Sequence, residues 1–279
     1  MNEISFDIQK AINYVMERCK ETDKYKLHLL LDEIDKAELE VKDLLLIQNE
    51  DGGIPYRFER DSISTISSTI MFFNDFLLLN HESLVSVELE KAIQYLLTLQ
   101  KIDGCFEEPS EIGKFDCAAW EAPGFESTQL YCTSVVINFL CGTKMSNVED
   151  AIVSGLNFLS KRWDYEKGFR SYPHTLWKAI PVFIMKKGEN DSISRRGAEM
   201  LETLQIRNYP SSSLVSMIEG FIHTGLENNK FVIKLFEILS TRQLPDGRWA
   251  SEDGEDYDLA TTLTFLVILK RLGKLQYNK

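Results

Sequence analysis

Apolar residues recur along this chain mainly with a helical period, in two kinds of segment that follow one another. In the first kind one face stays polar: within residues 89–100 the apolar side chains recur every three and four residues, which is the spacing of one helix face. The second kind is apolar nearly all round and is typical of a helix buried on every side; it comprises residues 66–79, 131–140 and 259–269. The first kind predicts outer helices and the second predicts inner helices.

The two kinds of segment are joined by a repeated motif. A glutamine that ends an apolar run is followed at fixed spacing by Asp-Gly and then by a bulky residue, in residues 48–54, 100–106 and 243–249. Two further units, at residues 156–177 and 201–223, look degenerate. With helices at residues 6–19 and 26–48 we expect roughly eleven helices, and no alternating strand pattern stands out. A repeat of this length indicates an array of one supersecondary unit. Pairs of outer and inner helices predict an all-α fold that closes into an α/α toroid, as a single domain over residues 1–279.

Composition and charge narrow the functional class. Of 279 residues, 44% are hydrophobic and 27% are charged, as in ordinary soluble globular proteins, and no apolar run approaches the roughly 20 residues of a membrane span. The formal net charge of −12 repels nucleic acid and anionic lipid. Five cysteines without a CxxC pair favour a reducing compartment. The first residues lack the pattern of a secretion signal, so we expect a cytoplasmic protein.

The Gln-x-x-Asp-Gly-x-aromatic repeats resemble the QW motifs of squalene and hopene cyclases, in the terpenoid cyclase and protein prenyltransferase superfamily. The resemblance covers about residues 43–273 and concerns the scaffold. It implies that the repeat residues tie the end of one helix to the next turn; these are Gln48, Gln100, Gln243 and Trp249.

The strongest catalytic candidates lie at the start of the last inner segment. Residues 255–262, Glu-Asp-Tyr-Asp-Leu-Ala-Thr-Thr, resemble the Asp-x-Asp-Asp-Thr-Ala signature of class II terpene cyclases. The resemblance implies that Asp258 is the proton donor and that Asp256 is its hydrogen-bonding partner, although Leu259 stands where a third Asp belongs. Two carboxylates in a dry cavity suit this role, because burial and mutual repulsion raise one pKa. The alternative is that either Asp caps the helix.

The resemblance also implies a hydrophobic small-molecule substrate in a central cavity. We expect aromatic rings on inner segments to stabilise carbocations and a loop arginine to receive a diphosphate. The long connection at residues 101–128 is expected across one mouth of the ring. The candidate substrate-binding residues are Tyr257, Trp177, Phe73, Tyr131, Trp120, His174 and Arg57. For the aromatic residues, packing in the core is the alternative.

No cofactor or metal is expected. The spacing of the four histidines matches no zinc-ligand pattern, which argues against a zinc site. We expect Mg²⁺ only if the substrate is a diphosphate. The leading prediction is a terpene-cyclase-like enzyme, an isomerase or lyase, that cyclises an isoprenoid by protonation. Prenyl transfer or another cyclase chemistry on the same ring is one alternative, and a non-catalytic binding or interaction module is another. A hollow lined by aromatic rings would favour the enzyme, whereas a filled centre would favour the binding module. The substrate and the oligomeric state are not indicated by the sequence.

Overall fold

The computed structural model describes residues 6–20 and 23–275, and these ranges are mainly helical. They contain twelve α-helices: α1 (Ile8–Arg18), α2 (Lys24–Leu30), α3 (Ile34–Leu45), α4 (Ile66–Leu79), α5 (Ser86–Thr98), α6 (Glu126–Thr143), α7 (Glu149–Ser160), α8 (Pro173–Lys187), α9 (Ser192–Thr203), α10 (Ser211–Ile222), α11 (Lys230–Ser240) and α12 (Glu255–Arg271). Two short antiparallel strands, β1 (Ile54–Pro55) and β2 (Ser64–Thr65), form the sheet in these ranges. The structure thus confirms the all-α prediction.

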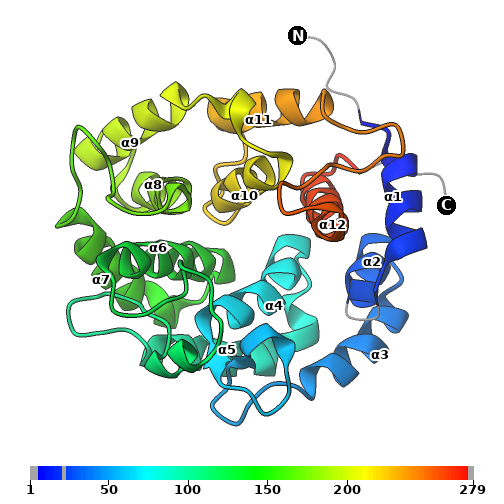
Figure 1. The fold of residues 1–279 in the computed structure, drawn as a ribbon, viewed down its shortest axis with the longest axis horizontal. Coiled ribbons are helices and arrows are strands. Elements are labelled where there is room, and N and C mark those ends of the chain that lie inside the picture. The colour runs from blue at the N-terminus through cyan, green and yellow to red at the C-terminus, as the bar shows by residue number, and fades with distance from the viewer. Residues whose placement is uncertain (1–5, 21–22, 276–279) are drawn as a thin grey trace.

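Inner and outer helices alternate along the chain. Figure 1 shows α1, α3, α5, α7, α9 and α11 along the rim, with α4, α6, α8, α10 and α12 toward the middle. Each of these inner helices packs on the next one, and α12 packs back on α2 and α4. The patterns that predicted outer and inner segments therefore distinguish the two positions correctly. No helix in the described ranges is both long and apolar enough to cross a bilayer.

The predicted helix at residues 26–48 is wrong, because it is two helices. The chain reverses between α2 and α3 at Asp32, whose φ of 60° is left-handed, a conformation that Asp adopts more readily than most residues. The N–H of Glu33 then donates to the carbonyl of His28 at 2.9 Å, which closes the end of α2 as in a Schellman motif. Neither Gly nor Pro marks this turn, so no stop signal was visible at residues 31–33. The count of eleven helices becomes twelve within the described ranges.

Each repeat glutamine acts as a clamp between three parts of the chain. Its Nε2 donates to the carbonyl of the glycine in its own turn and to a second carbonyl at the start of another outer helix. The acceptors are Gly52 and Glu88 for Gln48 (2.7 and 2.9 Å), Gly104 and Ala151 for Gln100 (3.2 and 2.8 Å), and Gly247 and Asp7 for Gln243 (2.9 and 2.9 Å). Asp7 is the N-cap of α1. The third clamp therefore joins the last repeat to the first helix.

A second contact in each repeat fixes the inner helix. The backbone N–H of the bulky residue donates to a threonine hydroxyl on the inner helix that follows: Ile54 to Thr69 (2.9 Å), Phe106 to Thr133 (2.9 Å) and Trp249 to Thr262 (3.0 Å). The motif glycine is needed as well. Gly104 has a φ of 92°, and a Cβ there would lie 2.2 Å from the carbonyl oxygen of Ser154 on α7. Only glycine lets the turn approach the next outer helix so closely.

Replacing a clamp glutamine tests its structural role. Gln243→Ala leaves the carbonyls of Gly247 and Asp7 without their donor, and we expect it to lower the free energy of unfolding by about 1–3 kcal/mol. The control is Gln205→Ala in a degenerate unit, where the exposed side chain accepts from Asn208; it should cost under about 0.5 kcal/mol. Urea unfolding measures both, and equal losses in the two variants would contradict the clamp.

Candidate functional site at the N-terminal mouth

The starts of α4, α6, α8 and α10 lie on one side of the molecule, which we call the N-terminal mouth, and the long connection at residues 101–125 lies on this side. Glu108 accepts hydrogen bonds from the N–H groups of Ile66 (2.7 Å) and Ser67 (2.8 Å) at the start of α4. Further along the connection, the carbonyl of Ala119 accepts a hydrogen bond of 2.9 Å from the hydroxyl of Tyr172. Tyr172 directly precedes α8. The connection is thus hydrogen-bonded at the starts of two inner helices. The sequence predicted that this segment lies across one mouth.

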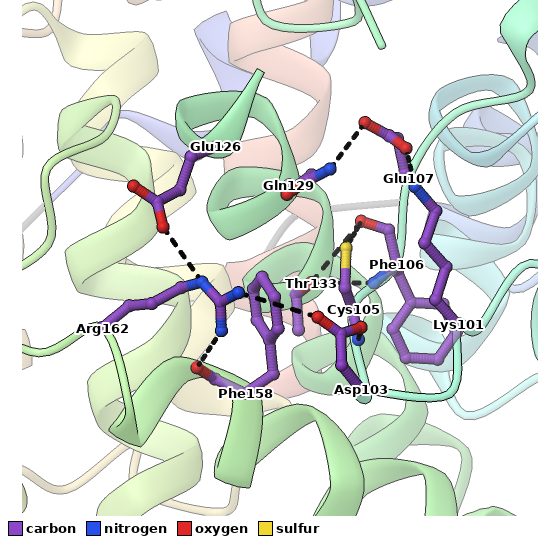
Figure 2. A network of polar contacts seen from close by, with 10 residues as sticks. All are labelled: Lys101, Asp103, Cys105, Phe106, Glu107, Glu126, Gln129, Thr133, Phe158 and Arg162. Atoms are coloured by element: carbon purple, nitrogen blue, oxygen red, sulfur yellow. Dashed lines mark hydrogen bonds and ion pairs between the residues drawn. The ribbon is translucent and has the colours of Figure 1, made fainter. Parts of the chain in front are cut away.

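A network of polar contacts holds the two ends of this connection in place (Figure 2). The carboxylate of Glu107 pairs with Lys101 and accepts from the N–H of Gly124 at 2.6 Å and from the Gln129 side chain at 3.0 Å. It therefore joins both ends of the connection to α6. Beside it, as Figure 2 also shows, Arg162 reaches Glu126 at 3.1 Å.

Glu108 is a buried carboxyl with a perturbed proton affinity. Burial raises its pKa to about 7, and the hydrogen bonds from Ile66 and Ser67 only partly oppose this effect. A carboxyl group near the start of a helix normally benefits from the positive end of the helix dipole. Here desolvation outweighs that benefit, so Glu108 exchanges its proton near neutral pH.

Aromatic side chains from three segments meet at this mouth. The ring of His174 lies 4.6 Å from Trp177 and 6.1 Å from Tyr131, measured between ring centroids. Tyr172 lies 5.9 Å from Tyr131, and Tyr209, just before α10, lies 5.9 Å from Trp177. We call these five residues the aromatic cluster. The structure thus brings together three of the predicted substrate-binding residues.

A cavity of about 220 Å³ adjoins the aromatic cluster and is lined by Phe169, Tyr172, Trp177, Leu204 and Tyr209 among others. The indole Nε1 of Trp177 is buried and has no hydrogen-bond partner among the described residues. An unsatisfied buried donor is costly, so this N–H suits a ligand that carries an acceptor. Tyr172 and Tyr209 were missed in the sequence, because they lie in loops of degenerate units.

Asp258 is held in the scaffold by two contacts. Its side chain is 4% exposed, and Oδ2 lies 2.9 Å from Nε of Arg248. Oδ1 accepts from the backbone N–H of Ser251 at 2.6 Å. The contact with Arg248 is an ion pair without the alignment of a hydrogen bond. The Asp258 side chain thus anchors the preceding loop instead of capping α12, which begins after Gly254. The role as proton donor stays a prediction.

The other predicted residues lie apart from the aromatic cluster or outside the described part. The side chain of Asp256 is not among those that the structure describes. Phe73 is fully buried and packs on the neighbouring Phe72 ring. Trp120 and Tyr257 are 49% and 56% exposed, and neither makes a ring contact with the cluster among the described residues. Arg57 is exposed and donates to the carbonyl of Asp116 at 2.6 Å.

Charged and amide side chains occupy the middle of the ring. Nζ of Lys178 on α8 lies 2.6 Å from Oε1 of Glu219 on α10, and Nζ of Lys26 lies 2.9 Å from Oδ2 of Asp75 on α4. Asn138 on α6 donates to the backbone of both α8 and α10. We call these five residues the central polar layer. The available signal was the single charge within the otherwise uncharged helices α4 (Asp75) and α10 (Glu219).

The electrostatics of this layer couple α4 to α10. Burial raises the pKa of Asp75, and Lys26 only partly offsets it, while Glu219 adds to the rise. At Glu219 burial acts in the same direction, but Lys178 prevails and the pKa falls below its usual range. The described residues contain no group of three or more side chains suited to hold a metal ion.

Comparison with known proteins informs the fold. No known family model matches the sequence, and no curated protein matches it. Among solved structures, the chain is similar to the crystal structure of a protein from Actinoplanes, with a TM-score of 0.59 and 13% sequence identity. The likeness covers 95% of this chain and 98% of that chain. At this identity the likeness shows a shared fold and nothing about activity.

Glu108 predicts a pH dependence of stability. Its folded pKa of about 7 exceeds the ordinary value of 4.5, so between these values the folded protein holds a proton that the unfolded chain has released. The free energy of unfolding should therefore fall as the pH rises through this window, by about 3 kcal/mol in total. Glu108→Gln should remove the decline, and the exposed Glu111→Gln should keep it. Urea unfolding from about pH 4 to pH 8 measures this; an unchanged slope in Glu108→Gln would show that the carboxyl is not responsible.

Proposed function

We propose that the protein binds a small apolar molecule, of isoprenoid type, at the N-terminal mouth of an α/α toroid related to the terpenoid cyclases and protein prenyltransferases. The toroid is supported by the alternation of inner and outer helices in Figure 1 and by the clamp from Gln243 to Asp7, which links the last repeat to α1. The solved structure that matches over nearly the whole of both chains supports a shared scaffold.

The observation that carries the proposal is the aromatic cluster beside its cavity. Ring faces of Trp177 and Tyr209 offer an apolar and polarisable surface, and the free indole N–H supplies one fixed polar contact. Sites for small molecules combine these features. The cavity of about 220 Å³ is smaller than the roughly 300–1,000 Å³ of typical ligand pockets, so it suits a short isoprenoid and not a chain of squalene length.

Binding at the mouth is better supported than turnover in the centre, because charged side chains lie between the inner helices there. A long apolar substrate in the middle would have to displace the ion pairs Lys178–Glu219 and Lys26–Asp75. Separating buried partners leaves uncompensated charges, which costs several kcal/mol for each pair. The ligand is therefore assigned to the mouth, where mostly aromatic and apolar side chains line the cavity and Lys167 is the one charged residue among the described residues that line it.

Removing one ring of the cluster tests the binding proposal. Tyr209→Ala enlarges the cavity and removes a face for the ligand, and we expect it to weaken the binding of geraniol or geranyl diphosphate about tenfold or more, about 1.4 kcal/mol. Isothermal titration calorimetry measures the Kd. The control Tyr165→Ala removes an exposed tyrosine that packs on Trp163 and should leave the Kd unchanged. Equal affinities in the two variants would refute the assignment of this cavity.

Proton-initiated cyclisation is the second candidate, supported by the burial of Asp258 in the first turn of the last inner helix. It requires Arg248 to move away from the carboxyl group when a substrate enters, because the two side chains are in contact at 2.9 Å. A diphosphate substrate would bring Mg²⁺ with it. Prenyl transfer or a cyclase chemistry on another metabolite would use the same mouth without Asp258 as the acid.

Asp258→Asn tests the acid directly. If Asp258 donates the proton, incubation with linear prenyl diphosphates and squalene should give cyclic products with the unchanged protein and none with the variant, as measured by gas chromatography and mass spectrometry. The variant should also lose about 1–3 kcal/mol of stability, because Arg248 and the Ser251 N–H lose a charged partner; circular dichroism checks that it is folded. Asp253→Asn, at an exposed position in the same loop, is the matched control. Equal turnover in both variants would remove the acid role.

A further inference from the structure

A second cavity, of about 200 Å³, lies at the opposite mouth, where the inner helices end. Its apolar wall comes from the last turns of α4 and α10, with Leu77, Leu78 and Ile222, and its polar groups include His223 and Arg271. We call this the C-terminal mouth. It lies at the other end of the inner helices from the aromatic cluster, and the function proposed above does not use it.

His223 is a buried histidine whose ring nitrogens lack a well-aligned hydrogen bond within the described residues. Its side chain is 7% exposed, and neither ring nitrogen makes a hydrogen bond in the described part of the chain. Burial lowers its pKa to about 4, so the ring is neutral at neutral pH and presents one donor and one acceptor. Gly142 makes room for it, because a Cβ there would lie 2.6 Å from Nδ1. The packing thus keeps a space for the ring, with the Asn138 backbone and the Glu219 carboxylate near it.

Arg271 presents a second unsatisfied donor to the same cavity. It belongs to the last turn of α12, and its Nη1 is buried without a hydrogen-bond partner among the described residues. The negative end of the helix dipole favours a cation at this position but does not replace the missing hydrogen bond. Lys144 and Glu227 also line the cavity. With neutral His223, the charged groups of the lining are therefore two cations and one carboxylate.

We propose that the C-terminal mouth binds a small monocarboxylate with a short apolar chain. The carboxylate accepts hydrogen bonds from Arg271 and from the N–H of His223, and so satisfies the donors that the fold leaves open. The chain packs on Leu77, Leu78 and Ile222. Glu227 disfavours a second carboxylate in the same cavity.

The test uses hexanoate as the probe, with the intact protein at neutral pH. We expect calorimetry to give a Kd of about 1 mM or tighter and NMR to show that hexanoate shifts the ring signals of His223. Hexanamide, which keeps the shape and loses the charge, should bind at least about tenfold more weakly. Absence of hexanoate binding, or equal binding of the two compounds, would overturn the proposal without any variant.

Two substitutions then locate the site. Arg271→Gln should weaken hexanoate binding about tenfold or more, and the exposed Arg170→Gln makes the same change of charge elsewhere and should not weaken it. His223→Phe keeps the ring volume and removes both nitrogens, so it should weaken binding while circular dichroism stays unchanged. Undiminished binding in both Arg271→Gln and His223→Phe would overturn the assignment to this cavity.

Discussion

The rest of the structure depends on one hydrogen-bonding device, the side-chain amide of the repeat glutamine. Each glutamine lies two or three residues after the end of an outer helix, where the chain turns inward. The amide bonds the turn that follows and the beginning of another outer helix at the same time, as Gln243 does with Gly247 and Asp7. Because one side chain fixes both the turn and a neighbour, the helix pairs have a set spacing, and the last repeat can meet α1.

The central polar layer sets where ligands can bind. Charges buried in the middle of the ring are tolerated only as pairs with good geometry, and Lys178 with Glu219 meets this condition at 2.6 Å. Asn138 then joins α6 to the backbones of α8 and α10. The two cavities described lie toward the two mouths. The helix dipoles give the first mouth a positive end and the second a negative end, so an anion at the second mouth depends on the cations Arg271 and Lys144.

Local patterns predicted the scaffold, and contacts across the ring could not be predicted. The periodicity and the glutamine motif are properties of short windows, so the helices and the clamps at Gln48, Gln100 and Gln243 could be inferred. The division into α2 and α3 was missed because it depends on a left-handed Asp32 with no Gly or Pro beside it. Single charges within apolar helices were visible too, yet which cation meets which carboxylate depends on how distant helices face each other.

Asp258 occupies a position that the scaffold also uses in the other repeats. In each repeat a threonine on the inner helix accepts from the backbone N–H of the bulky residue. Four positions before that threonine the three repeats have Thr65, Gln129 and Asp258. All three fasten local structure: Thr65 accepts from Ser68, Gln129 donates to Glu107, and Asp258 accepts from Ser251. The position is thus an anchor in every repeat, and its residue type varies. Only the third repeat places an arginine, Arg248, just before its bulky residue, and Asp258 supplies the matching charge. The physical demand of the scaffold is sufficient to account for an aspartate at this position.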